Sequence, residues 1–213
     1  MPHPPAPVSP EEPSLLFLLT SAIERLDWTR IFPQPQPLEI ELGSGDGSFL
    51  LAWARRHPER NFLGVERLGG RLGKLDRQGR RAGLQNLRGL RVESAYFTEY
   101  LVPPGSVAAF HIYFPDPWPK KRHAANRIIQ PHFAAVLHRA LAADGTVYLR
   151  TDHEAYFAQM LEVMRGAAGF RETETPAALA AVTTDFEREF AAQGIPAQRA
   201  AFGKTPVPQS SER

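Results

Sequence analysis

The sequence predicts an α/β fold in which a mostly parallel sheet is covered by helices on both faces. Two observations lead to this prediction. Segments with strand character alternate with segments of helical character from residue 38 to residue 164, and this alternation is typical of parallel strands joined by crossover helices. The chain has 213 residues, of which 43% are hydrophobic, so it can bury one sizeable core.

The part that precedes this alternation is expected to hold an arm and a helix. Residues 1–13 contain six prolines and are expected to form a disordered arm. Leu15–Leu26 is expected to be a helix with Ser14 as its N-cap. We expect a single domain over residues 14–204 and a flexible tail over residues 205–213.

The alternating part carries the elements of the expected sheet. Strands are expected at Leu38–Leu42, Asn61–Glu66, Leu87–Val92, Val107–Tyr113 and Thr146–Arg150. Helices are expected at Ser48–Arg56, Arg67–Ala82, Ala124–Ala142 and Glu154–Met164. Ligands of such folds bind at the carboxyl ends of the strands, so the chemistry is expected in the segments that follow each strand.

A glycine-rich turn, E-L-G-S-G-D-G, follows the first of these strands. Glycine at alternate positions permits a tight turn and close approach of a ligand to the backbone; these positions are Gly43, Gly45 and Gly47. Ser48 stands where a dinucleotide-binding loop needs its third glycine. Glu41 and Asp46 flank the turn, where they would repel a pyrophosphate. They suit the amine and sulfonium of S-adenosylmethionine, whereas an ordinary strand–helix turn is the alternative.

The next two strand ends complete the predicted cofactor site. Glu66 ends its strand, and a carboxylate there can accept hydrogen bonds from both ribose hydroxyls of a nucleoside. In this fold class the end of the third strand presents an acid or amide to the adenine. Glu93 and Ser94 are both candidates, because the pattern leaves the register open by one residue.

The segment F-P-D-P-W-P-K-K-R, residues 114–122, is the most specific feature of the chain. Its three prolines stiffen the backbone. Asp116 can accept hydrogen bonds from the N1–H and N2–H₂ groups of a guanine, and Trp118 can stack on a base. The cations that begin with Lys120 can hold phosphates. The alternative is a proline-rich surface loop in which Trp118 only packs.

One further acid stays ambiguous, and no metal site is expected. Asp152, in T-D-H-E, follows the fifth strand, where it is either the N-cap of the next helix or a contact to a base. The seven histidines show no metal-binding spacing. The chain has no cysteine, which excludes disulfides and thiolate metal sites and fits a cytoplasmic location.

The charge distribution points to a polyanionic partner, although the net charge is only +2. Residues 67–91 hold eight Lys and Arg residues against one acid, and residues 117–143 hold five with no acid. Such asymmetry is typical of a nucleic-acid-binding face, whereas a solvated helix surface is the alternative. Residues 1–10 have neither a basic region nor an apolar region, so they are not expected to be a secretory signal, and no apolar stretch is long enough to predict a membrane span.

These motifs closely resemble those of the bacterial tRNA (guanine-N7)-methyltransferases. The resemblance runs from about residue 15 to residue 204. It rests on E-L-G-S-G-D-G, F-L-G-V-E, F-P-D-P-W-P-K-K-R-H with N-R-I-I-Q, T-D-H-E-A-Y and T-T-D-F-E. It implies a Rossmann-like class I methyltransferase fold with a seven-stranded sheet. It also implies transfer of a methyl group from S-adenosylmethionine to N7 of guanine 46 in the tRNA variable loop, leaving S-adenosylhomocysteine.

The resemblance also assigns residues. It implies cofactor contacts at Glu41, Glu66 and Asp116, and tRNA or guanine contacts at Lys120 and Asp152. The C-terminal element Thr184, Asp185, Phe186 and Glu187 is implied to bind substrate. Ser94 stands where the family has an acid before an alanine. The resemblance leaves monomer and homodimer both open.

Guanine N7 carries a free lone pair, so the predicted reaction needs no strong general base. Its rate should come from alignment of N7 with the methyl group, and Asp116 is the expected catalytic residue. Three alternatives remain at this point: an NAD-dependent oxidoreductase, a non-catalytic RNA-binding protein on a methyltransferase scaffold, and a methyltransferase for a protein or small molecule. The acids around the glycine-rich turn disfavour the first.

Overall fold

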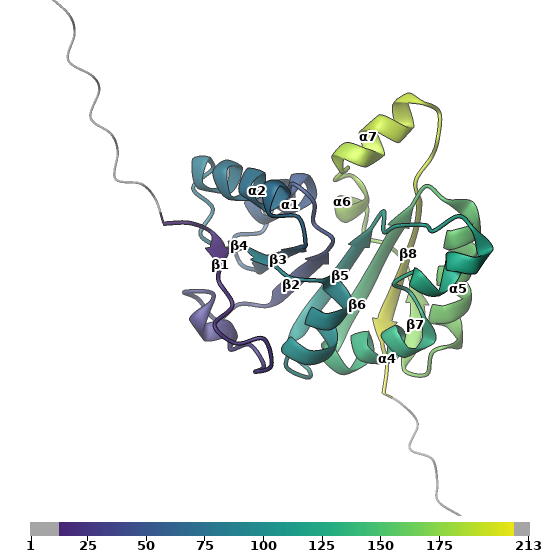
Figure 1. Cartoon of the computed structure of the whole chain (residues 1–213), viewed down its shortest axis with the longest axis horizontal. Helices are drawn as coiled ribbons and strands as arrows, with labels where there is room; N and C mark the ends of the chain where they lie inside the picture. The colour runs from purple at the N-terminus through teal and green to yellow at the C-terminus, as the bar shows by residue number, and fades with distance from the viewer. Residues whose placement is uncertain (1–12, 207–213) are drawn as a thin grey trace, which may run out of the picture.

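In this computed structural model, residues 13–206 are described and form one sheet with the strand order β1-β4-β3-β2-β5-β6-β8-β7 (Figure 1). The strands are β1 (Leu16–Phe17), β2 (Leu38–Leu42), β3 (Asn61–Glu66), β4 (Leu87–Arg91), β5 (Val107–Tyr113), β6 (Leu141–Thr151), β7 (Phe170–Thr173) and β8 (Gln198–Lys204). The helices are α1 (Ser48–Arg56), α2 (Gly69–Arg81), α3 (Ser94–Tyr96), α4 (Pro131–Ala140), α5 (Glu154–Gly166), α6 (Ala177–Ala180) and α7 (Asp185–Ala192).

The sheet is mostly parallel, as predicted. The pairs that join β1 to β6 run parallel, whereas β8 runs antiparallel to both β6 and β7. The described residues contribute eight strands, one more than the seven expected. The additional strand is β1, which pairs with Gly89 and Leu90 of β4 at the edge of the sheet.

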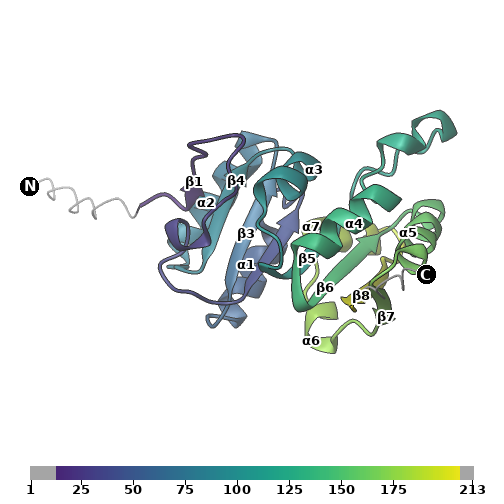
Figure 2. The same cartoon turned by 90° about the horizontal axis from the view of Figure 1, so that it is seen from below.

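Helices cover both faces of the sheet (Figure 2). On one face α1, α2 and α6 pack over a core that includes Phe49, Phe62 and Leu179. On the other face α4 and α5 pack over a larger core that includes Ile40. Because side chains alternate along a strand, the acids of β2 point to the first face, toward α1. Two carboxylates are therefore buried under that helix layer.

The prediction of a helix over Leu15–Leu26 is wrong. The backbone N–H of Leu15 and the hydroxyl of Ser14 both donate to Asp76 Oδ1, at 2.7 and 3.1 Å. These bonds tie the segment to α2, and Leu16–Phe17 then forms β1. Ser14 thus anchors an edge strand, because pairing with β4 outweighs the helical character of the apolar run.

The helix expected over Ala124–Ala142 is shorter than predicted. A 3-10 segment covers Lys121–Asn126, and α4 begins only at Pro131, which suits the first turn of a helix. The bounds of α1, β3 and β5 match the predicted ones. Most of the predicted arm and tail, residues 1–12 and 207–213, lies outside the described residues. Within residues 13–206, no helix is long and apolar enough to cross a membrane.

Candidate active site

A cavity of about 570 Å³ lies at the carboxyl ends of the central parallel strands, where the sequence predicted the chemistry. Its volume falls in the range of small-molecule sites. Six predicted residues line it: Gly43, Glu66, Glu93, Ser94, Asp116 and Trp118. The lining also includes Arg67 and Arg71, which belong to the basic run predicted to face a polyanion, and Asn126, which was not predicted. Arg67 follows Glu66 at a strand end, so its position in the sequence was a usable signal.

The glycine-rich turn has the geometry that its composition predicted. Gly43, Gly45 and Gly47 all have positive φ angles, between 57° and 82°. A Cβ atom on Gly47 would lie 2.7 Å from Leu75 Cδ1, so this position requires glycine for packing as well. Glu66 accepts hydrogen bonds from the N–H of Gly45 (3.1 Å) and of Leu68 (2.8 Å). Glu66 therefore holds the turn in place while it lines the cavity.

Glu41 is buried beside this turn, with 4% of its surface exposed. Within residues 13–206 no group donates a hydrogen bond to its Oε2 atom. Burial raises the pKa of Glu41 well above its usual range; Arg150 opposes this rise, whereas Asp46 and Glu66 add to it. A buried acceptor without a donor is a costly arrangement that a cationic ligand would relieve. Glu41 therefore fits the amine of an amino-acid-bearing cofactor.

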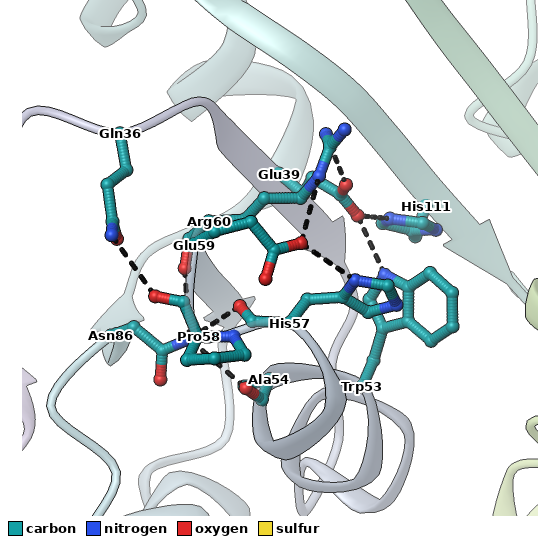
Figure 3. A network of polar contacts seen from close by, with 10 residues as sticks. All are labelled: Gln36, Glu39, Trp53, Ala54, His57, Pro58, Glu59, Arg60, Asn86 and His111. Atoms are coloured by element: carbon teal, nitrogen blue, oxygen red, sulfur yellow. Dashed lines mark hydrogen bonds and ion pairs between the residues drawn. The ribbon is translucent and has the colours of Figure 1, made fainter.

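Glu39, two residues earlier on β2, is fully engaged (Figure 3). Its Oε2 accepts from Trp53 Nε1 at 2.9 Å and contacts His111 Nε2 at 2.8 Å, and its Oε1 accepts from Arg60 at 3.0 Å. His111 Nδ1 lies 2.8 Å from the hydroxyl of Tyr113. Sequence patterns do not predict this network, because its members are far apart along the chain.

Both candidates for the adenine contact line the cavity. The carboxylate of Glu93 is also the N-cap of α3, where it accepts from the N–H groups of Ala95 (2.9 Å) and Tyr96 (2.7 Å). Ser94 is half-buried at the same strand end. The assignment of the adenine contact to either residue stays a prediction.

The F-P-D-P-W-P segment is a braced loop. Phe114 and Trp118 have φ angles of 51° and 42°, which non-glycine residues rarely adopt. Arg127 Nε donates to the carbonyl of Pro117 at 2.7 Å, and the Trp118 ring meets the His123 ring edge-on at 5.9 Å. Strained backbone held by its surroundings is common at functional sites. The loop presents Asp116, which is exposed, to the cavity.

Of the predicted substrate residues only Trp118 lines the cavity; Lys120, Asp152 and the C-terminal element Thr184–Glu187 do not. Lys120 is exposed beyond the loop, and Asp152 is half-buried after β6. The N-cap of α5 is His153, whose side chain accepts from the N–H of Tyr156 at 3.2 Å, so the N-cap interpretation of Asp152 is wrong. A contact from Asp152 to a base stays a prediction.

The C-terminal element divides into buried and exposed residues. Thr184 and Glu187 are buried, and Thr184 caps α7 by accepting from the N–H of Glu187 at 3.0 Å. Asp185 and Phe186 are exposed. The Arg71 guanidinium lies 6.0 Å from the centre of the Phe186 ring. Of these four residues only Asp185 and Phe186 are exposed, and Asp185 is paired with Arg188. Phe186 lies beside Arg71, a residue of the cavity wall.

The chain matches a known protein family. Residues 35–200 match the family described as "Putative methyltransferase", which is more than half of the chain. The chain belongs to this family of methyltransferases. Membership implies S-adenosylmethionine as the methyl donor, as predicted from Glu41 and the glycine-rich turn. Within the described residues no cluster of histidine and acidic side chains could hold a metal ion.

Curated relatives of this methyltransferase share a common name. The tRNA (guanine-N(7)-)-methyltransferase of Leifsonia xyli is 45% identical over 139 residues, which cover 65% of this chain and 61% of the relative. The protein of that name from Photobacterium profundum is 36% identical over 154 residues, which cover 72% of this chain and 63% of the relative. The matched part thus spans about three-fifths of the length of these relatives.

Solved structures confirm the fold of this methyltransferase. The 16S rRNA methyltransferase KamB matches with a TM-score of 0.59 at 16% identity, over 85% of this chain and 93% of that one. A 30S ribosomal A1408 methyltransferase from an uncultured bacterium matches with a TM-score of 0.60 at 15% identity, over 84% and 92%. At such identities the likeness establishes the Rossmann-like methyltransferase fold.

Proposed function

We propose that this chain transfers a methyl group from S-adenosylmethionine to N7 of guanine 46 in the variable loop of tRNA. The observation that carries this proposal is the ligand-sized cavity at the carboxyl ends of a parallel sheet, which Gly43, Glu66 and Asp116 line. Glu41 precedes the lining residues Leu42 and Gly43 in the chain, and its buried Oε2 atom has no donor within residues 13–206. The names of the curated relatives support the choice of tRNA and of guanine N7. An enzyme of tRNA would act in the cytoplasm.

S-adenosylmethionine, when bound, supplies an electrophilic methyl group on a sulfonium. Glu41 would hold its amine, Glu66 its ribose, and Glu93 or Ser94 its adenine. The backbone at Gly43 is open to the cavity, and a side chain there would be strained at a φ of 78°. The residues of this chain therefore provide an acceptor for each donor group of the cofactor.

The braced loop would hold the purine. Asp116 would accept from the Watson–Crick edge of guanine, and Trp118 would stack on the ring or fix the loop. Positive charge moves onto the purine as N7 is methylated. A carboxylate nearer to the purine than to the sulfonium stabilises that change, whereas one equidistant from both gives no acceleration. Asp116 therefore acts by position and charge, not as a base.

The outer surface of α2 would bind the RNA backbone. Four cations that lie three or four residues apart share one stripe of this helix and are exposed: Arg71, Lys74, Arg77 and Arg81. The stripe begins at the cavity, because Arg71 is part of its wall. Phosphate contacts along α2 would thus guide a nucleotide toward the methyl donor.

The test is incubation with labelled S-adenosylmethionine and unmodified tRNA, followed by nucleoside analysis. We expect 7-methylguanosine, and its absence when position 46 is adenosine.

Asp116→Ala should lower kcat by about 10²- to 10³-fold, the loss caused by removing one contact to a developing charge. Asp144→Ala, an exposed aspartate in β6, is the matched control. RNA binding without methyl transfer would refute the proposal, as would a preference for NADH over S-adenosylhomocysteine in thermal-shift assays.

A further inference from the structure

Arg150 is a buried cation in β6 with 1% of its surface exposed. Its side chain binds three groups of the segment that holds α6 and α7. It donates to the carbonyl of Val182 at 2.6 Å, to the carbonyl of Leu179 at 2.7 Å and to Glu187 Oε2 at 3.0 Å. The guanidinium also lies 4.2 Å from the centre of the Tyr113 ring. One side chain thus fastens the C-terminal element to the sheet.

The element fastened in this way reaches the mouth of the cavity. The N–H of Asp185 donates to the Ser48 hydroxyl at 3.2 Å, at the end of the glycine-rich turn. The Phe186 ring lies 6.5 Å from the Phe114 ring and 6.0 Å from Arg71, and both of these residues line the cavity. In Figure 1, α7 lies beyond the ends of β5 and β6, with α6 next to it.

The backbone of Arg150 also binds the braced loop, which lies on the other side of the cavity mouth from α7. Its carbonyl accepts from the N–H of Phe114 at 2.8 Å, at the start of the braced loop. Glu187, in contrast, directs both carboxylate oxygens inward, one to Arg150 and one to Arg199. Glu187 is only 4% exposed, so its carboxylate contacts other residues of the protein and is not accessible from solvent.

We infer that Arg150 is a positioning residue that sets the Asp185–Phe186 pair over the cavity, and that Glu187 affects RNA only through its internal contacts with Arg150 and Arg199. This inference rests on the proposed function, because it concerns how the substrate is held. Arg150 touches neither substrate nor cofactor in this role. It fixes the two walls between which a base would enter.

A double-mutant cycle tests the link between the two residues. Arg150→Gln and Glu187→Gln should each raise the KM for tRNA about tenfold or more, with the Kd for S-adenosylhomocysteine unchanged within about twofold. The double variant should be less impaired than the product of the two single effects, because both single variants lose the shared Arg150–Glu187 contact. Effects that multiply in the double variant would show that Glu187 contacts RNA directly and would overturn the inference.

Hydrogen exchange provides a readout that needs no RNA. In Arg150→Gln, amides of residues 177–192 should exchange at least about tenfold faster, whereas those of β2 to β5 keep their protection. Unchanged protection of residues 177–192 would overturn the inference even if the enzyme methylates tRNA normally. If the protein forms no 7-methylguanosine, the proposed function fails, and the exchange result still decides whether Arg150 positions α7.

Two further variants guard against loss of folding and nonspecific effects. Removing one partner of a buried ion pair leaves an unpaired charge, so Arg150→Gln could unfold the protein. Arg150→Lys keeps the charge but cannot bind two carbonyls and a carboxylate in the same fork. It should show the same faster exchange of α7, and full protection would count against the inference. Arg165→Ala, which breaks only an exposed pair with Glu172, should change none of these quantities.

Discussion

Two buried carboxylates on β2, Glu39 and Glu41, face the same side of the sheet but have opposite surroundings. Glu39 receives three hydrogen-bonding partners from α1, β5 and the start of β3. Although burial alone would raise it, the contacts with His111, Trp53 and Arg60 hold the pKa of Glu39 below its usual value. Burial leaves the pKa of Glu41 well above that value, and one of its oxygens has no donor within residues 13–206.

The difference shows at which end of the sheet the protein itself supplies the hydrogen-bond partners of a buried acid. Near the amino ends of the strands, the protein supplies every partner that its buried acid needs. Near the carboxyl ends, the protein buries an acid whose Oε2 atom has no donor within residues 13–206, and our proposal is that a ligand supplies that partner. Burying a charge without a partner is costly, so such a group is a signature of a site rather than of a core.

The largest expected effect is on stability, at Glu39. Glu39→Ala leaves the donors of Trp53 and Arg60 without their buried acceptor, so the free energy of unfolding should fall by about 3–5 kcal/mol. Urea unfolding measures this change. The Kd for S-adenosylhomocysteine should stay as in the wild type if the variant is folded. Glu59→Ala, at an exposed carboxylate nearby, should change stability by no more than about 0.5 kcal/mol.

The next effect is on cofactor affinity, at Glu41. Glu41→Gln keeps the shape of the side chain but removes the charge that would pair with the cofactor amine. The Kd for S-adenosylhomocysteine should rise about 10- to 100-fold by calorimetry, as expected for a hydrogen bond to a charged group. The stability of the free protein should not fall, because no internal partner is lost. A large loss of stability would instead assign Glu41 to the core, like Glu39.

Glu39 and Glu41 also show how much of this structure can be predicted from sequence patterns. Local patterns predicted the bounds of α1, β3 and β5. Of the acids predicted at strand ends, Glu66 and Asp116 line one cavity, whereas Glu41 lies in the strand that leads to it but not in its lining. The roles of all three toward a ligand stay predictions. The sequence pattern cannot separate Glu39 from Glu41, since both are acids in an apolar strand. Their difference is made by Trp53, Arg60 and His111, whose approach depends on tertiary packing.

The errors have the same origin. Leu15–Leu26 has helical character, but its first residues pair with β4 and bind Asp76, which lies 61 residues from Leu15. Arg150 lies near the end of a strand, as predicted, but its buried contacts were not predicted, because its partners lie 29 to 37 residues further along the chain. Contacts at such separations leave no periodic signal in the sequence.

A smaller effect concerns pH and follows from the raised pKa of Glu41. The cofactor amine pairs with the ionised carboxylate, so binding releases a proton wherever free Glu41 is protonated. Affinity for S-adenosylhomocysteine should therefore increase as the pH rises from 4.5 toward the raised pKa of free Glu41, by at most about tenfold per pH unit. Calorimetry in buffers of different ionisation enthalpy counts the proton. In Glu41→Gln the dependence should vanish; a pH-independent wild type would contradict the assignment.

Stability should move in the opposite direction with pH. The folded free protein holds the Glu41 proton more tightly than the unfolded chain does, whose ordinary pKa is 4.5. The contribution of this group to stability is therefore present in full below pH 4.5 and is lost as the pH rises through the raised pKa. Bound S-adenosylhomocysteine should remove this loss, since it supplies the missing partner.

The smallest expected effect concerns RNA binding on α2. It tests whether the functional surface extends from the cavity at the carboxyl ends of the strands onto the exposed side of this helix. Arg77 and Arg81 are exposed on α2, beyond the part of the cavity wall formed by Arg71. Arg77→Ala and Arg81→Ala should each weaken tRNA binding only a few-fold. Each should also reduce the slope of log K against log salt by about one unit, because one phosphate contact is lost. An unchanged slope in both variants would confine the functional surface to the cavity itself, with α2 serving as a solvated cover of the sheet.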